Sequence, residues 1–143
     1  MFRVTRGYRF AASHRLHAAA LTEEENRRVY GKCNNPYGHG HNYVVEVSVR
    51  GPLDERSGTA VDVPLLDGLV AREVLAPFEH GNLNAAAAFA NVVPTSENLA
   101  VEICRRLKRN WSSVFAGEWP RLEKIRIEET ARNIFEIDAD EIE

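Results

Sequence analysis

The sequence has little of what marks the unusual classes of protein. Its 143 residues contain only two cysteines, which excludes a disulfide scaffold and favours a reducing, cytoplasmic setting. No apolar run approaches the roughly 20 residues that a membrane helix needs, and the first residues have no signal-peptide core. Acidic and basic residues are interspersed, and the net charge is −3. We therefore expect neither a membrane nor a nucleic-acid partner.

The remaining composition is that of an ordinary globular protein. Hydrophobic residues make up 44% of the chain and charged residues 27%, close to the averages for folded domains. A chain of this length typically buries about 68% of its unfolded surface, which is enough for one core. We expect a single domain over residues 1–143.

Two long strands are predicted in the first third of the chain. Apolar side chains recur at every second position over residues 2–14 and again over about 39–49. The segment between them, residues 21–38, is polar and contains several glycines, asparagines and a proline. This composition predicts a loop.

The second half of the chain predicts two helices followed by two strands. Asp62 and Thr95 or Ser96 are helix-start residues, and an apolar stripe at helical spacing follows each start. The expected elements are a helix from Asp62 to just before Pro77, a loop over 78–93, a helix from Thr95 to about Trp111, and strands over 124–129 and 133–137. The order ββααββ predicts an α+β fold, with both helices on one face of a small antiparallel sheet.

Three histidines are candidates for a metal site. His39 and His41 lie two residues apart on a predicted strand, so both imidazoles point to the same face. His14 lies on the apolar parity of the first strand, and pairing of the two strands would bring it close to both. Three neutral imidazoles suit zinc and leave its fourth position open to water or substrate. The alternative is a pair of half-exposed histidines at the start of a strand.

The two cysteines have different predicted roles. Cys104 lies on the apolar stripe of the second helix and is expected in the core. Cys33 lies in the polar loop, six residues before His39. Its thiol could be the fourth ligand of a closed, structural zinc site. It could instead be a thiolate held near the cation, with a pKa below the free value of about 8.5.

Two acidic residues are also candidates for a functional role. Glu129 shares the parity of Ile125 and Ile127, so its carboxylate is expected on the buried side of a strand, which favours ligand binding or an inter-subunit contact. Glu79 precedes His80 in a loop, and such a pair could accept and relay a proton near pH 7. A solvated histidine without a role is the alternative for His80.

Five segments carry a resemblance that covers nearly the whole chain. They are FAASHRLH at 10–17, GKCNNPYGHGHNY at 31–43, EHGNLN at 79–84, PTSEN at 94–98 and ET at 129–130. In this order they closely resemble the 6-pyruvoyl-tetrahydropterin synthase family. The resemblance implies the tunnelling fold (T-fold), in which ββααββ subunits form a trimeric barrel and two trimers stack into a homohexamer. It also implies active sites between subunits.

The resemblance assigns roles to individual residues and implies a substrate. It assigns the binding of Zn2+ to His14, His39 and His41. It makes Cys33 the catalytic base, with His80 and Glu79 as its relay partners, and Glu129 the anchor for the pterin ring. Thr95, Ser96 and Glu97 match a segment that lines the pterin pocket across an interface. The implied substrate is 7,8-dihydroneopterin triphosphate. The implied reaction is conversion to 6-pyruvoyl-tetrahydropterin with elimination of triphosphate.

One residue departs from the family pattern. Glu79 stands where family members commonly have aspartate, and the extra methylene would shift the carboxylate by roughly 1–1.5 Å.

Two other functions compete with the implied one. The related 6-carboxy-tetrahydropterin synthase of queuosine biosynthesis acts on the same substrate but releases acetaldehyde. The six-residue step from Cys33 to His39 resembles the pyruvoyl-forming type. The third possibility is a non-catalytic pterin-binding module stabilised by a closed zinc site.

Overall fold

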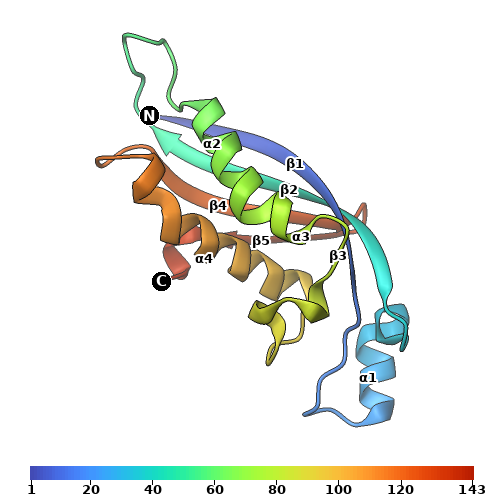
Figure 1. Cartoon of the computed structure of the whole chain (residues 1–143). Helices are drawn as coiled ribbons and strands as arrows, with labels where there is room; N and C mark the ends of the chain where they lie inside the picture. Colours follow the sequence, from blue (N-terminus) through green and yellow to red (C-terminus); the bar gives the residue numbers. More distant parts are fainter.

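A five-stranded sheet forms the centre of the computed structural model, which describes residues 1–143 (Figure 1). The strands are β1 (Phe2–His14), β2 (His39–Gly51), β3 (Gly81–Asn82), β4 (Arg121–Thr130) and β5 (Asn133–Asp138). They lie in the order β3-β1-β2-β4-β5. All neighbours are antiparallel except β3, which runs parallel to β1. The predicted α+β fold is confirmed, with one short parallel strand added at the edge.

Helices cover one face of this sheet (Figure 1). They are α2 (Val63–Val70), which continues through a π turn (Ala71–Leu75) into α3 (Ala76–Phe78), and α4 (Ser96–Val114). Both predicted start signals are present as caps: the Asp62 side chain accepts from the Leu65 amide, and that of Thr95 accepts from the Asn98 amide. None of the helices has the length and apolar character needed to cross a membrane.

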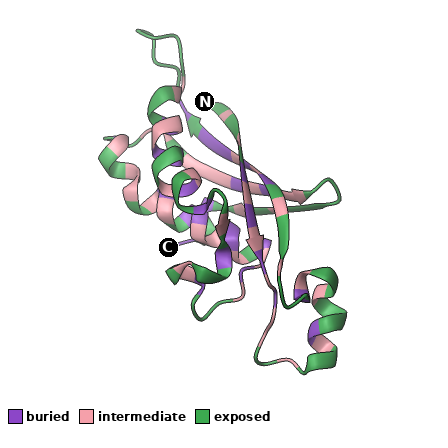
Figure 2. Cartoon of the chain, turned by 45° about the vertical axis from the view of Figure 1, so that its right-hand side comes forward, coloured by how far each residue is buried: buried purple, intermediate pink, exposed green.

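The core lies between the sheet and these helices (Figure 2). The buried side chains of the three long strands on this face are Phe10, Ala12, His14, Tyr43, Val45, Val47, Val49, Ile125 and Ile127. They alternate with residues on the other face, as the period of two requires. His14 is 1% exposed, so the core face ends in a buried polar side chain.

The segment predicted as a loop over 21–38 contains a helix, so that prediction is wrong for α1 (Glu23–Tyr30). A capping box forms its start, in which Thr22 and Glu25 each accept a hydrogen bond from the other's backbone amide. The helix has no apolar stripe, because its one buried residue is Asn26. A search for hydrophobic periodicity therefore misses it.

Two smaller differences concern the region after α2. The helix does not end before Pro77, because the π turn at Ala71–Leu75 leads without a break into α3, which contains Pro77. The predicted loop over 78–93 contains β3 and two single turns of 3-10 helix, at Leu83–Ala85 and Ala87–Phe89.

Candidate metal and catalytic site

The register of β1 and β2 brings three histidines together. His14 lies directly opposite His39, and Ala12 lies opposite His41, so the three imidazoles share one face of the sheet. The ring of His41 lies between the other two, with centroids 4.9 Å from His14 and 4.8 Å from His39. His14 is buried, whereas His39 is exposed at the end of the strand.

His14 has the orientation of a metal-binding histidine. Its Nδ1 lies 2.9 Å from the carbonyl oxygen of Pro94, to which a protonated Nδ1 donates. The lone pair is then on Nε2, which lies 3.1 Å from Nε2 of His41. A backbone carbonyl that fixes the ring and its tautomer is typical of histidines that bind metals. The Pro94 carbonyl has no signature in the sequence, because any residue supplies the same atom.

Cys33 completes a compact group of possible ligand atoms. It lies in a 3-10 turn (Gly31–Asn34), and its carbonyl accepts a 2.7 Å hydrogen bond from the Leu16 amide. Its Sγ lies 3.7 Å from Nε2 of His41, and one ligand atom each from His14, Cys33 and His41 lie within 4.8 Å of one another. Ligand atoms that share a tetrahedral zinc ion lie roughly 3.3–3.7 Å apart. The contacts of His41 with His14 and Cys33, at 3.1 and 3.7 Å, are close to this spacing, so the group is a candidate metal site.

Glu129 lies on β4, beside these residues. Its Oε1 is 3.8 Å from Nε2 of His41, and its Oε2 accepts a hydrogen bond from the Ser96 hydroxyl. The side chain is 11% exposed, in agreement with its predicted place on the buried parity. A carboxylate in this position can accept hydrogen bonds from a planar donor group.

Burial shifts the pKa values of the side chains at the centre of the site. It lowers the pKa of His14, and it lowers that of His41 against an opposing effect of Glu129. Burial also raises the pKa of the Tyr43 hydroxyl and of the Cys33 thiol, so the surrounding side chains do not themselves produce the lowered pKa expected of a thiolate at Cys33. The lowered pKa values of His14 and His41 favour the neutral imidazole, which is the form that binds a metal.

Glu79 and His80 lie apart from this group. Nε2 of His80 lies 3.0 Å from Oε1 of Glu79, and His80 is held beside β1 by a hydrogen bond from its amide to the Ala11 carbonyl. His80 lines a hollow with Ser13 and Asn42, and of the residues in the metal group only His41 borders it. No hydrogen bond or ion pair joins either residue to Cys33 within the chain.

The predicted pterin-pocket segment has three different environments. Ser96 is buried and contacts Glu129. The Thr95 side chain caps α4 through the Asn98 amide, and Glu97 is exposed in the first turn of that helix. Only Ser96 therefore contacts the group around His41 within one chain.

The chain is similar to known proteins in sequence and in fold. A sequence model of the family described as 6-pyruvoyl tetrahydropterin synthase matches residues 3–140. The 6-pyruvoyl tetrahydrobiopterin synthase of Poecilia reticulata is 45% identical over 92% of this chain and 86% of its own. The solved structure of the Caenorhabditis elegans 6-pyruvoyl tetrahydropterin synthase is 39% identical, with a TM-score of 0.84 over 96% of this chain and 94% of that one. A putative 6-carboxy-5,6,7,8-tetrahydropterin synthase of Archaeoglobus fulgidus matches 48% of this chain and 55% of its own, at 39% identity.

Proposed function

Because the chain belongs to the 6-pyruvoyl tetrahydropterin synthase family, we propose that it converts 7,8-dihydroneopterin triphosphate to 6-pyruvoyl-tetrahydropterin by eliminating triphosphate. It is a lyase. The observation that carries the proposal is that His14, Cys33, His41 and Glu129 meet at one end of three adjacent strands. The relatives named 6-pyruvoyl tetrahydrobiopterin synthase match most of the chain, whereas the 6-carboxy relative matches about half.

The histidines would hold a zinc ion. His14 and His41 present facing Nε2 atoms, and His39 lies at the open, exposed side of the pair. When bound, zinc supplies a Lewis acid that polarises the hydroxyls of the substrate side chain and makes the adjacent C–H bond more acidic. The Pro94 carbonyl keeps the tautomer of His14 that is competent to bind.

The remaining side chains would bind the pterin and move the proton. Glu129 accepts hydrogen bonds from the guanidine-like edge of the ring, and Ser96 orients its carboxylate. The Cys33 thiolate removes a proton from the side-chain carbon that carries the second hydroxyl. The electron pair of that C–H bond forms a carbon–carbon double bond, and the C–O bond to triphosphate breaks as the leaving group takes its own bonding pair. The resulting enol tautomerises to a methyl ketone. The other keto group and the tetrahydro ring arise together, because hydrogen shifts from the carbinol carbon next to the ring to the ring C=N bond, which needs no external oxidant or reductant.

His80 and Glu79 would serve the site of a neighbouring chain. Within one chain no hydrogen bond or ion pair joins them to Cys33, and of the metal group only His41 borders the hollow that His80 lines. The sheet also has two open edges: β3 covers β1 only at Ala12 and Ser13, and β5 has a neighbour on one side only. Open edges invite pairing with another chain. These edges support closure of the sheet into an oligomeric barrel by edge pairing. The family resemblance makes that barrel a trimer and the assembly a homohexamer of two trimers.

We also propose a cytoplasmic location. Cys33 and Cys104 are free thiols. The proposed role of Cys33 requires a reduced sulfur, which a reducing compartment maintains.

The experiment that tests the function is product identification. Purified, zinc-loaded protein is incubated with 7,8-dihydroneopterin triphosphate, and the products are identified by mass spectrometry. We expect 6-pyruvoyl-tetrahydropterin and one equivalent of triphosphate. Acetaldehyde with a 6-carboxy pterin would replace the proposal by the related activity, and unchanged substrate would favour a binding module.

Glu129→Gln is expected to weaken pterin binding and leave the metal in place. A carboxylate offers two acceptor oxygens to the paired donors of the pterin edge, whereas an amide offers one oxygen and an NH2 group that opposes a donor. The dissociation constant of neopterin, measured by fluorescence, should rise about tenfold or more. Glu128→Gln, one residue earlier on the opposite parity, is the matched control. Equal affinities in both variants would remove the anchor role.

Mixing two inactive variants tests the inter-subunit relay. Cys33→Ala and His80→Ala chains are co-expressed with different tags, and mixed oligomers are purified through both tags. If each site takes Cys33 from one chain and His80 from the next, random mixing leaves about a quarter of the sites intact and restores about that share of activity.

A control pair separates this outcome from general rescue. Cys33→Ala mixed with His14→Gln should restore nothing, because both residues belong to the same chain's group. Failure of the first mixture, with normal assembly, would place His80 in the site of its own chain or outside the reaction.

A further inference from the structure

A basic hollow opens beside the metal site, between the end of β1, the helix α1 and the start of β2. Its volume is about 390 Å³, within the range of small-molecule sites. The charged and titratable side chains that line it are Arg15, Glu23, Arg27, Lys32 and His39. The rest of the lining is asparagine, glycine and proline, so the hollow offers nothing to an apolar ligand.

Its cations are largely unpaired. Arg27 lies 4.0 Å from Glu23 across one exposed helical turn, which is a weak contact. Arg15 uses only its Nε, which donates to the Asn34 carbonyl at 3.3 Å, and nothing engages its two terminal nitrogens. No hydrogen bond or ion pair engages the ammonium of Lys32. Three cations against one carboxylate make this a positive site on a chain whose net charge is −3.

The hollow lies at one end of a row of site residues formed by Glu129, His41 and His39. Glu128 pairs with Val44, which places Glu129 near the level of Tyr43 on β2. His41 and His39 follow toward the start of that strand, and His39 lines the hollow. A molecule whose ring binds at Glu129 and whose hydroxyls reach the histidines would therefore extend its far end into the basic hollow.

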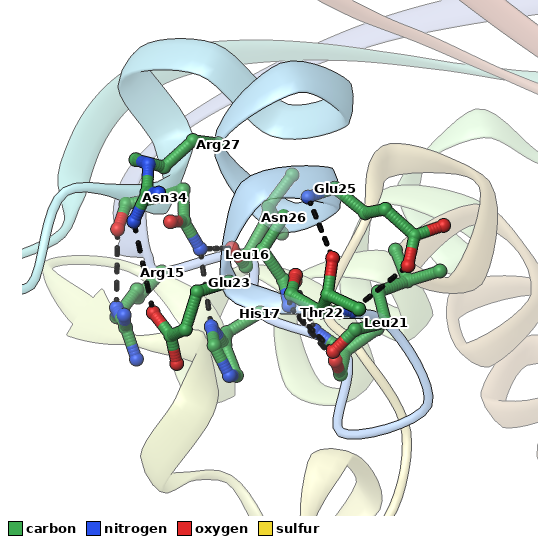
Figure 3. A network of polar contacts seen from close by, with 11 residues as sticks. Arg15, Leu16, His17, Leu21, Thr22, Glu23, Glu25, Asn26, Arg27 and Asn34 are labelled. Carbon is green, nitrogen blue, oxygen red and sulfur yellow. Dashed lines mark hydrogen bonds and ion pairs between the residues drawn. The ribbon is translucent and has the colours of Figure 1, made fainter.

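The walls of the hollow are fixed by a polar network (Figure 3). The Asn34 amide donates to the Leu16 carbonyl at 2.7 Å and lies 3.2 Å from His17 Nδ1. The buried Asn26 amide accepts from the Ala18 backbone and donates back to it, which ties α1 to the segment before it. The Asn84 side chain accepts a 2.6 Å hydrogen bond from the Arg15 amide and donates a 2.9 Å hydrogen bond to the Arg15 carbonyl. The cations therefore project from a preorganised frame.

We propose that Arg15, Arg27 and Lys32 bind the triphosphate of the substrate and stabilise it as it leaves. This rests on the proposed function. In the elimination the C–O bond breaks and its electron pair goes to the phosphate oxygen, where the added negative charge is met by guanidinium and ammonium groups. Arg27 tests this role most cleanly, because it lies on α1 and neither neighbours nor contacts Cys33 or a histidine of the site.

The probe is inorganic tripolyphosphate, titrated by calorimetry into the zinc-loaded protein, with the zinc content measured before and after. We expect binding that weakens with added salt and is tighter than that of orthophosphate. Arg27→Gln and Lys32→Gln should each raise the dissociation constant about tenfold. Glu23→Gln should lower it, because it removes the one carboxylate in the hollow.

Arg28→Gln is the matched control, since Arg28 is exposed on the same helix and does not line the hollow. An unchanged dissociation constant in Arg27→Gln and Lys32→Gln, or an equal loss in Arg28→Gln, would overturn the inference. In turnover, Arg27→Gln should raise KM and lower kcat, while the affinity for neopterin, which lacks phosphate, should stay unchanged. Tripolyphosphate binding that depends on Arg27 in a protein without turnover would refute the proposed function and leave the anion site standing.

Discussion

Cys33→Ala is expected to lower kcat by about 10³-fold while the protein keeps its zinc. The expectation follows from two features. His14 and His41 present facing Nε2 atoms without the sulfur, and His39 is available beside them. The Cys33 thiol lies beside the metal group, since its Sγ is 3.7 Å from Nε2 of His41. It can therefore reach a side-chain carbon of a substrate that is bound at this group. The measurement pairs single-turnover kinetics with zinc analysis on the same preparation.

The same distances describe the competing possibility, a closed site in which sulfur is a zinc ligand. In that case Cys33→Ala would lose metal in proportion to activity, and the thermal midpoint would fall with it. Cys33→Ser separates the two further, because a hydroxyl fills the space of the thiol but is a poor base and a poor zinc ligand. Loss of zinc in both variants would refute the role of Cys33 as a base and support the closed structural site.

The long strands and the closeness of His14, His39 and His41 could be predicted because successive side chains of a strand point to opposite faces of the sheet. Alternation along residues 2–14 and 39–49 fixes which side chains share a face, and antiparallel pairing then sets His14 opposite His39. Glu129 followed from the same parity. These inferences needed only local pattern and one assumed strand pairing.

Other parts of the site depend on contacts between distant segments. The Pro94 carbonyl that orients His14 is a backbone atom, 80 residues away in the chain. The basic hollow combines Arg15, Arg27 and Lys32, which become neighbours only because α1 folds back on the end of β1. The capping box of α1 was present in the sequence as Thr22 and Glu25, and it indicates a helix where hydrophobic periodicity does not.

His14→Gln is expected to reduce bound zinc from about one per chain to nearly none and to abolish turnover. His14 is the buried member of the group, and the Pro94 carbonyl holds its ring in one tautomer, so a flexible amide cannot replace it. The measurement is zinc content after dialysis, together with the thermal midpoint with and without a chelator.

The chelator separates loss of metal from general misfolding. A metal that binds only the folded state stabilises it by mass action, so chelation should lower the midpoint of the wild-type protein and leave that of His14→Gln unchanged. His17→Gln is the control, because it alters a histidine three residues further on that contacts Asn34 and no residue of the metal group. A His14→Gln protein that kept its full zinc content would show that the ion binds elsewhere. The proposed elimination would then have no electrophile at the place where Cys33, His41 and Glu129 meet.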